Sequence, residues 1–265
     1  MRGLALLPLL MAGTVQAGCL DDPDPCTKTD GIYHIALPQD AEAPPVVVFL
    51  HGAGGTGGQT LRNAALRDAV TARGYALIAP TGSRGFGGGK SWNFLPGWEG
   101  RDEGVFLRQV VDDAAERFGT DADRVLLAGF SAGAFMVYYT ACADPGAFPA
   151  YAPVAGGFWR PQPTHCAGPV DLFHTHGWTD RVVPLEGREL RAGEFIQGDI
   201  WAGLELWRDT NGCDGHDPDS SWISGDLWRR SWACETDLQL ALFPGGHRLP
   251  AGWSDLVLDW FETLE

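Results

Sequence analysis

The sequence predicts an α/β domain in which a mostly parallel central sheet is covered by helices on both faces. Short β-branched or apolar runs without polar alternation recur along the chain, as expected of strands buried on both faces. Segments with apolar residues at helical spacing lie between these runs, and such alternation implies right-handed crossovers and parallel strands. The length of 265 residues is sufficient for one domain with a sizeable core.

The strands are identified by their apolar runs and by the turns that bound them. The first run alternates apolar and polar residues, which is typical of an edge strand, and the later ones are continuously apolar. A Gly-rich turn at 51–58 follows the second run. In chain order, we expect strands at 31–38, 44–50, 75–80, 124–130 and 170–177, and a final strand and loop at 238–247.

Apolar residues recur at intervals of three and four between these strands and predict amphipathic helices. Gly74 and Gly119 stand where two of the helices would end, and Ser254 is the expected N-cap of the last one. The helical stripes are Leu61–Val70, Phe106–Phe118, residues 132–143, Ile196–Trp207 and Leu256–Leu264.

The N-terminal residues 1–17 have the pattern of a secretory signal, with Arg2, a short apolar run and small residues before a cut after Ala17. Cleavage before Cys19 would instead give a lipoprotein, but Gln16 disfavours it. We expect a secreted or periplasmic protein without a stable membrane anchor, in which 18–265 form a single domain with an irregular, Trp-rich insertion at about 210–235.

Charge and cysteines support this assignment. The chain has 19 Lys and Arg against 34 Asp and Glu, a formal charge of −15 that argues against nucleic acid as a partner. Its six cysteines suit an oxidising compartment. Sequence proximity favours Cys19–Cys26, Cys142–Cys166 and, most strongly, Cys213–Cys234. No Cys-x-x-Cys pair is present, and we expect no metal site.

Ser131 is the first candidate for chemistry. It stands between Gly129 and Gly133 in a Gly-x-Ser-x-Gly pattern, where a buried strand ends and a helix begins. A serine on such a tight turn projects above the sheet edge, and only very small residues fit two positions before and after it. A helix-capping serine is the alternative, but the flanking strand and helix favour a nucleophile.

A nucleophilic serine needs a base and a residue that orients the base. His247 lies in the loop after the last predicted strand, and Asp180 lies in the loop after the strand at 170–177. Both loops leave the carboxyl ends of parallel strands, where the chemistry of such sheets gathers. Asp171 is a poorer candidate for the acid, because it starts its strand and so lies at the opposite edge of the sheet. The alternatives are a salt-bridged Asp180 and a solvated His247.

The turn His51–Gly55 ("HGAGG") supplies donors for an oxyanion. It follows a buried strand and resembles a His-Gly-Gly-Gly turn, whose backbone N–H acts together with that of the residue after the nucleophile. We expect Ala132 and either Ala53 or Gly54 to donate, and the sequence leaves the choice between these two open. His51 itself is expected to shape the turn.

These motifs resemble the secreted polyhydroxybutyrate depolymerase / feruloyl esterase family of α/β hydrolases. The resemblance runs from about Tyr33 to the C-terminus and rests on "VVVFLHGAGG", "SWNF", "DEGVFL", "RVLLAGFSAGAFM", "APVAGG", "HTHGWTDRVVP", "NGC" and "GGHRLP" in this order. It implies the α/β-hydrolase fold, with Ser131 as nucleophile, His247 as base and Asp180 as orienter. The chain departs from the family at Ala134, where a glycine is usual, and in its Trp-rich segment.

The resemblance implies a carboxylic ester as substrate and an acyl-enzyme that requires no cofactor. Polyhydroxybutyrate-like oligo- or polyesters are the favoured substrates, and feruloyl or acetyl esters of plant polysaccharide are the alternative. Acyl transfer and non-catalytic binding on the same scaffold are further alternatives. Trp178, Trp92 and Asn93 are candidates for substrate contact. We expect a monomer, and we expect His176 to shape the turn that carries Asp180.

Overall fold

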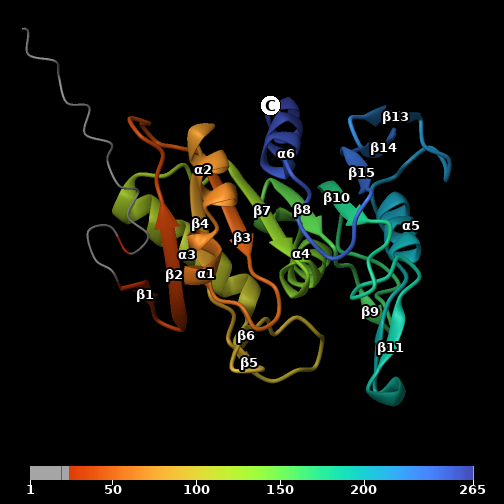
Figure 1. The fold of residues 1–265 in the computed structure, drawn as a ribbon, viewed down its shortest axis with the longest axis horizontal. Helices are drawn as coiled ribbons and strands as arrows, with labels where there is room; N and C mark the ends of the chain where they lie inside the picture. Colours follow the sequence, from red (N-terminus) through yellow and green to blue (C-terminus); the bar gives the residue numbers. More distant parts are fainter. Residues whose placement is uncertain (1–18, 20–23, 265) are drawn as a thin grey trace, which may run out of the picture.

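A computed structural model gives the fold of Cys19 and of residues 24–264. The predicted signal segment, residues 1–17, lies outside the described residues. The main sheet has the strand order β1-β2-β4-β3-β7-β8-β10-β15-β14-β13, and helices lie on both of its sides (Figure 1). The strands from β4 to β15 in this order run parallel to one another. At each end of the sheet, the two outer strands each pair antiparallel with the neighbour on their inner side. The predicted fold class is therefore confirmed.

All six predicted strands are present, and the structure adds several that the sequence did not indicate. One of these, β8, lies in the middle of the sheet. The bounds are β1 (Cys26–Lys28), β2 (Gly31–Ala36), β3 (Val46–Leu50), β4 (Ala76–Pro80), β7 (Val125–Phe130), β8 (Ala150–Val154), β10 (Asp171–Gly177), β13 (Ser220–Ser224), β14 (Leu227–Trp232) and β15 (Leu238–Phe243).

The side chains of the central strands alternate between two separate cores, one on each face of the sheet. In β3, for example, Val46, Val48 and Leu50 pack into one core, and Val47 and Phe49 pack into the other. The first core lies under α3 (Glu103–Phe118), α4 (Ala132–Ala143) and α5 (Ile200–Thr210). The second lies under α1 (Gly57–Arg62), α2 (Ala64–Ala72) and α6 (Trp253–Phe261).

Three of the predicted helices differ from the structure. The helix expected over Leu61–Val70 is two helices, α1 and α2, divided at Asn63. The stripe that was expected to begin at Ile196 starts with strand β12 (Phe195–Gln197), and α5 begins only at Ile200, where Asp199 caps it through the backbone N–H groups of 201 and 202. Ser254 lies inside α6, whose N-cap is Gly252 with a φ of 71°. Local apolar spacing does not distinguish a strand from the helix it leads into.

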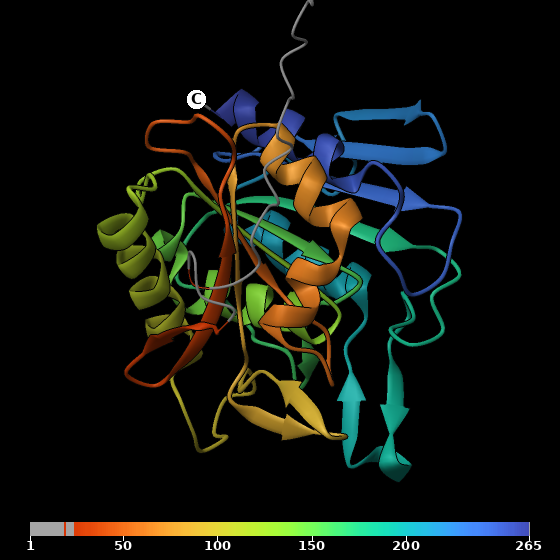
Figure 2. The same cartoon turned by 60° about the vertical axis from the view of Figure 1, so that its left-hand side comes forward.

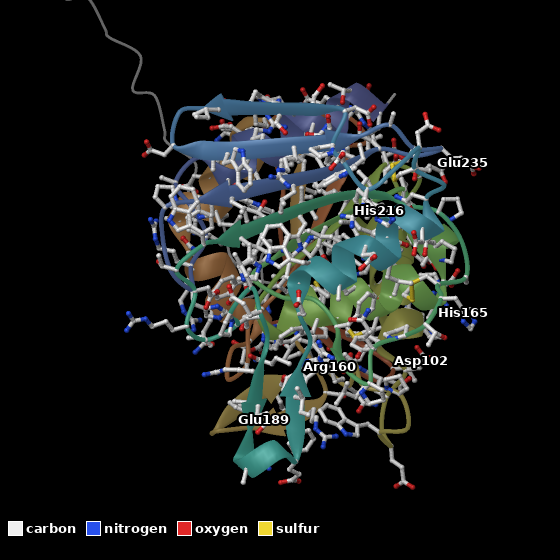
Figure 3. All side chains as sticks on the ribbon, turned by 90° about the vertical axis from the view of Figure 1, so that its right-hand side faces the viewer. Asp102, Arg160, His165, Glu189, His216 and Glu235 are labelled. Carbon is white, nitrogen blue, oxygen red and sulfur yellow. A yellow bond between two sulfur atoms is a disulfide. The ribbon has the colours of Figure 1, made fainter. Side chains whose placement is uncertain are left out.

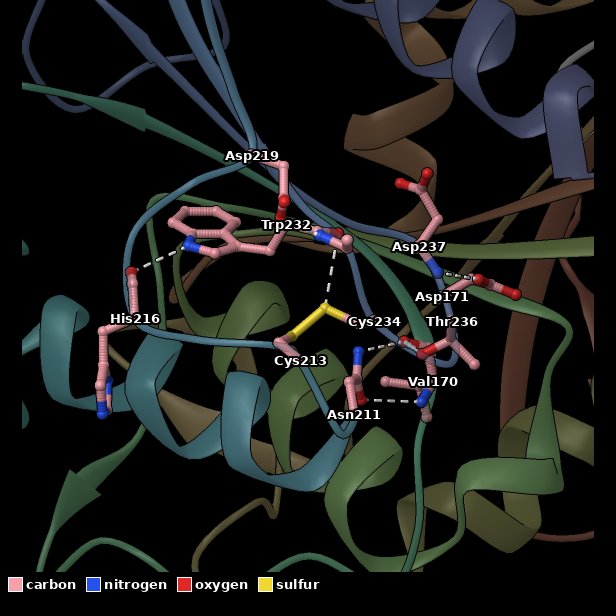
Figure 4. The surroundings of a disulfide bond; sticks show 11 residues. Val170, Asp171, Asn211, Cys213, His216, Asp219, Trp232, Cys234, Thr236 and Asp237 are labelled. Carbon is pink, nitrogen blue, oxygen red and sulfur yellow. Dashed lines mark hydrogen bonds between the residues drawn. A yellow bond between two sulfur atoms is a disulfide. The ribbon is translucent and has the colours of Figure 1, made fainter.

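Part of the expected irregular insertion at 210–235 is regular. Strands β13 and β14 form an antiparallel hairpin that extends the sheet beyond β15. The disulfide Cys213–Cys234 ties the chain after α5 to the chain after β14 (Figure 4). Beside it, Trp232 Nε1 donates to the carbonyl oxygen of His216 at 3.1 Å. Cys19–Cys26 and Cys142–Cys166 are also formed, so all three expected disulfides are confirmed.

Two small sheets project from the edge at which the parallel strands end (Figures 1 and 2). One is the hairpin of β5 (Arg84–Phe86) and β6 (Gly89–Ser91), which follows β4. The other joins β11 (Arg188–Leu190), β12 and β9 (Trp159–Arg160), and Figure 3 marks it by Arg160 and Glu189. No helix in the described part of the chain is long and apolar enough to cross a membrane.

Candidate active site

Ser131 occupies a strained turn between β7 and α4. Its φ of 57° and ψ of −115° are unusual for a residue with a side chain. The glycines around it are required by space: a Cβ at Gly129 would lie 2.6 Å from the carbonyl carbon of Gly133, and one at Gly133 would lie 2.1 Å from the Leu50 oxygen. The backbone therefore holds the Ser131 hydroxyl at the carboxyl edge of the sheet.

His247 lies between Ser131 and Asp180 and contacts both. Its Nε2 is 2.9 Å from Ser131 Oγ, and its Nδ1 is 2.7 Å from Asp180 Oδ2. Since a carboxylate only accepts, Nδ1–H donates to Asp180, and Nε2 is left to accept from the serine hydroxyl. The three side chains come from the loops after β7, β10 and β15, and their hydrogen bonds form the continuous series that general-base activation of a serine requires.

The Asp180 carboxylate is held in place on both of its oxygens. Oδ1 accepts from the backbone N–H groups of Val182 (2.8 Å) and Val183 (2.9 Å), while Oδ2 faces His247. Burial on its own raises the pKa of this carboxyl, but the hydrogen bonds from His247 and from the two amides outweigh it and hold the pKa below its ordinary value. Asp180 is thus an anion with a fixed orientation at neutral pH.

The structure distinguishes between the two candidate donors in the turn after β3. The N–H of Gly54 donates to the carbonyl oxygen of Lys90 at 2.8 Å and is therefore occupied. The N–H of Ala53 has no partner among the described residues. A Cβ at Gly52 would lie 3.4 Å from Ser131 Cβ, so this turn adjoins Ser131. Of the two, Ala53 is the one whose N–H remains available, and its joint role with Ala132, the first residue of α4, as oxyanion donors stays a prediction.

His51 shapes this turn, as the sequence indicates, and takes no part in the triad. Its Nδ1–H donates to the Gly52 oxygen (2.7 Å), and its Nε2 accepts from the N–H of Gly82 (3.1 Å). Burial lowers the pKa of His51, and the ring is neutral. Trp92 Nε1 donates to the His51 carbonyl oxygen (2.8 Å). Because Trp92 is 0% exposed, it supports the turn from the core and does not face a substrate, contrary to the expectation from sequence.

Glu103, at the start of α3, is a supporting residue that the sequence analysis did not single out. It is buried and accepts from the N–H and hydroxyl of Ser83, from the N–H of Asn93, and from the guanidinium of Arg101. It thereby joins the loops on either side of β5 and β6. The Asn93 side chain donates within its own loop, to the carbonyl oxygens of Trp98 and Arg101, and its contact with a substrate remains a prediction.

Three large apolar side chains are exposed close to these groups. Trp178 and Val182 are 49% and 45% exposed on the loop that carries Asp180. Phe86, at the end of β5, is 54% exposed, and a Cβ at Gly54 would lie 4.0 Å from its ring. We call these three residues the apolar rim. Two of its residues belong to the Asp180 loop and the third adjoins the turn after β3, and contact of Trp178 with a substrate remains a prediction.

Comparisons with known proteins agree on one chemistry. No family model matches the chain. It is 33% identical to poly(3-hydroxyalkanoate) depolymerase C of Paucimonas lemoignei over 130 residues, which cover 48% of this chain and 31% of the relative. It is 26% identical to feruloyl esterase C of Emericella nidulans over 274 residues, covering 91% and 90% of the two chains.

Solved structures share the fold at low identity. The acetyl xylan esterase of Aspergillus awamori has a TM-score of 0.67 at 17% identity and covers 94% of this chain and 99% of that one. Coverage of the curated relatives varies: besides the depolymerase, two others are matched over only 21% and 44% of their own length. The relatives and the structural neighbours include carboxylic ester hydrolases with different substrates.

Proposed function

We propose that the chain is an esterase of the α/β-hydrolase fold that hydrolyses carboxylic esters with Ser131 as nucleophile, His247 as general base and Asp180 as orienter. The observation that carries this proposal is the hydrogen-bonded series Ser131–His247–Asp180, with contacts of 2.9 and 2.7 Å. The catalytic roles follow from the donors and acceptors along the series.

In the acylation step, Ser131 Oγ attacks the ester carbonyl carbon while its proton passes to His247 Nε2. The resulting oxyanion accepts hydrogen bonds from the N–H groups of Ala132 and Ala53. The ester C–O bond then breaks, and the departing alcohol takes the proton from His247. A water molecule next gives a proton to His247 and its hydroxyl to the acyl carbon, which releases the acid and returns the proton to Ser131.

We further propose that the substrate is an uncharged oligoester of hydroxyalkanoic acids. The apolar rim of Phe86, Trp178 and Val182 supports this, because it exposes apolar side chains on the Asp180 loop and beside the turn after β3. Phe130 adds to it, with its ring 4.7 Å from that of His247. The relative from Paucimonas lemoignei acts, by its name, on poly(3-hydroxyalkanoate).

A feruloyl ester is the second candidate, and a specific observation favours it. The match to feruloyl esterase C covers nine-tenths of both chains, whereas the match to the depolymerase covers less than half of either. A ferulate ring would also find aromatic contact at Trp178.

The proposals are tested on one panel of substrates: p-nitrophenyl acetate, methyl ferulate and soluble hydroxybutyrate oligomers. We expect the wild type to hydrolyse p-nitrophenyl acetate and the oligomers, and Ser131→Ala, with an unchanged circular dichroism spectrum, to be inactive on all three. Undiminished activity of the folded Ser131→Ala protein would refute the role of Ser131 as nucleophile. A kcat/KM for methyl ferulate that exceeds that for the oligomers would establish the second candidate.

Export to an oxidising compartment is part of the same proposal. All six cysteines are paired in disulfides, and such bonds persist in secreted and periplasmic proteins. Mass spectrometry of the exported protein, with and without reduction, would detect both the three disulfides and a cut after Ala17. A retained N-terminus or free thiols would contradict it.

A further inference from the structure

A row of three buried polar side chains lies beneath the loop that carries Asp180. Tyr138 comes from α4, and His174 and His176 come from β10; all three are 0% exposed. The Tyr138 hydroxyl is 2.7 Å from His174 Nδ1, and His174 Nε2 is 3.0 Å from His176 Nδ1. His176 Nε2 is 2.8 Å from the carbonyl oxygen of Val183. Buried polar groups of this kind are costly unless every one is hydrogen-bonded.

The direction of each hydrogen bond in this row follows from its last member. The Val183 carbonyl only accepts, so Nε2 of His176 carries a proton. Burial lowers the pKa of both histidines, and two neutral rings are therefore present. Nδ1 of His176 accepts from Nε2–H of His174, whose Nδ1 accepts from the hydroxyl of Tyr138. Every donor thus points toward Val183, and no other arrangement of protons on neutral rings satisfies all three bonds.

Val183 connects this row to the triad. Its N–H donates to Asp180 Oδ1 at 2.9 Å, and its carbonyl oxygen accepts from His176 at 2.8 Å. The same Nε2 of His176 lies 3.7 Å from Asp180 Oδ2, the oxygen that faces His247. Val183, whose N–H helps to orient the Asp180 carboxylate, is therefore bound through its carbonyl oxygen by the buried row.

We propose that Tyr138, His174 and His176 are positioning residues of the triad, whose one-directional row of hydrogen bonds fixes Val183 and through it holds Asp180 against His247. This inference rests on the proposed role of Ser131 as a nucleophile, but not on which ester it cleaves. The neutral state of His176 is part of the device. A protonated His176 would compete with His247 for the Asp180 carboxylate. Asp180, His247 and Glu186 are the ionisable groups that act on His176.

The test compares two substitutions at His174. His174→Gln keeps an amide donor for His176 Nδ1, whereas His174→Leu removes the donor and leaves the packing volume similar. We expect His174→Leu to lower kcat on p-nitrophenyl acetate about ten-fold with KM nearly unchanged, the size expected when one buried hydrogen bond is lost. We expect His174→Gln to stay within about two-fold of the wild type. Equal kcat values for the two folded variants would overturn the proposal and leave a purely structural role.

A second readout separates this proposal from the proposed ester hydrolysis. The rate of Ser131 labelling by a fluorophosphonate depends on the activated hydroxyl and not on an ester, and it should fall about ten-fold in His174→Leu but not in His174→Gln. If His174→Leu does not fold, Tyr138→Phe removes only the first donor and should slow labelling. Tyr151→Phe also loses a buried hydroxyl, but Tyr151 lies near the start of β8, away from the carboxyl edge of the sheet. It is the control and should be labelled at the wild-type rate.

Discussion

Replacing Asp180 by asparagine tests the triad most sharply, because the structure determines how the new amide must turn. Oδ1 of Asp180 accepts two backbone N–H groups, from Val182 and Val183. In Asp180→Asn, the amide oxygen must occupy this position, since an NH2 group there would face two donors. The NH2 group is then directed at His247 Nδ1.

This orientation changes which ring nitrogen of His247 carries the proton. Nδ1 must accept from the amide, so the proton of the neutral ring moves to Nε2, which can no longer accept from the hydroxyl of Ser131. A serine triad that holds its histidine in the wrong tautomer loses a factor of about 10⁴ in kcat. This factor corresponds to ~5.5 kcal/mol of transition-state stabilisation. We expect a loss of this size with KM little changed, because no substrate contact is removed.

The assay is hydrolysis of p-nitrophenyl acetate at pH 7, with folded protein quantified by circular dichroism. Asp171→Asn is the matched control. Asp171 is the first residue of β10, at the opposite end of that strand from the Asp180 loop, and it accepts from the N–H of Asp237. It should retain activity within about two-fold of the wild type, since a residue outside the site perturbs catalysis little. An Asp180→Asn protein that keeps a tenth of the wild-type kcat would refute both the tautomer argument and the role of Asp180.

Three further predictions concern stability and binding. In Gly133→Ala, the new Cβ meets the Leu50 oxygen at 2.1 Å, and we expect urea unfolding to show a loss of ~1–3 kcal/mol; unchanged stability would contradict the close packing of the turn. Trp178→Ala should raise KM for the preferred ester several-fold and leave the unfolding free energy within ~0.5 kcal/mol, because the ring is 49% exposed; an unchanged KM would remove Trp178 from the substrate site. The lowered pKa of Asp180 stabilises the fold above the unfolded value of about 3.9 and ceases to do so as the pH falls through the folded value. The stability difference between wild type and Asp180→Asn in urea should therefore shrink from pH 7 to pH 3, and a constant difference would argue against an ionised, hydrogen-bonded Asp180.

The parts of the fold that local sequence determines are those that were predicted. The buried strand β3 is apolar throughout, because both of its faces meet a core. α3 begins after Asp102, whose side chain accepts from the N–H of Val105, and it ends at Gly119 with a φ of 69°. Such signals lie within a few residues of the boundary they set.

Features that depend on distant partners were not predictable. β8 is a central strand only because β7 and β10 pair with it, and β14 is ordered by β15. Trp92 was a candidate for substrate contact, but its indole N–H instead donates to the carbonyl oxygen of His51, 41 residues earlier in the chain. The choice between Ala53 and Gly54 depends on Lys90, which belongs to a hairpin that the sequence did not indicate.

The same distinction explains how the candidate site is built. The turn at Ser131 is fixed by the close approach of backbone at its two glycines, which is why a five-residue pattern identifies it. The turn after β3 and the Asp180 loop have no such local constraint, and buried polar side chains lie beside each of them. Glu103 joins the loops on either side of β5 and β6, the hairpin whose Lys90 binds the turn after β3, and the row that ends at His176 holds the Asp180 loop. Buried polar groups are costly in a core, so their concentration under these two loops indicates that the loops must be held still for the three parts of the site to meet.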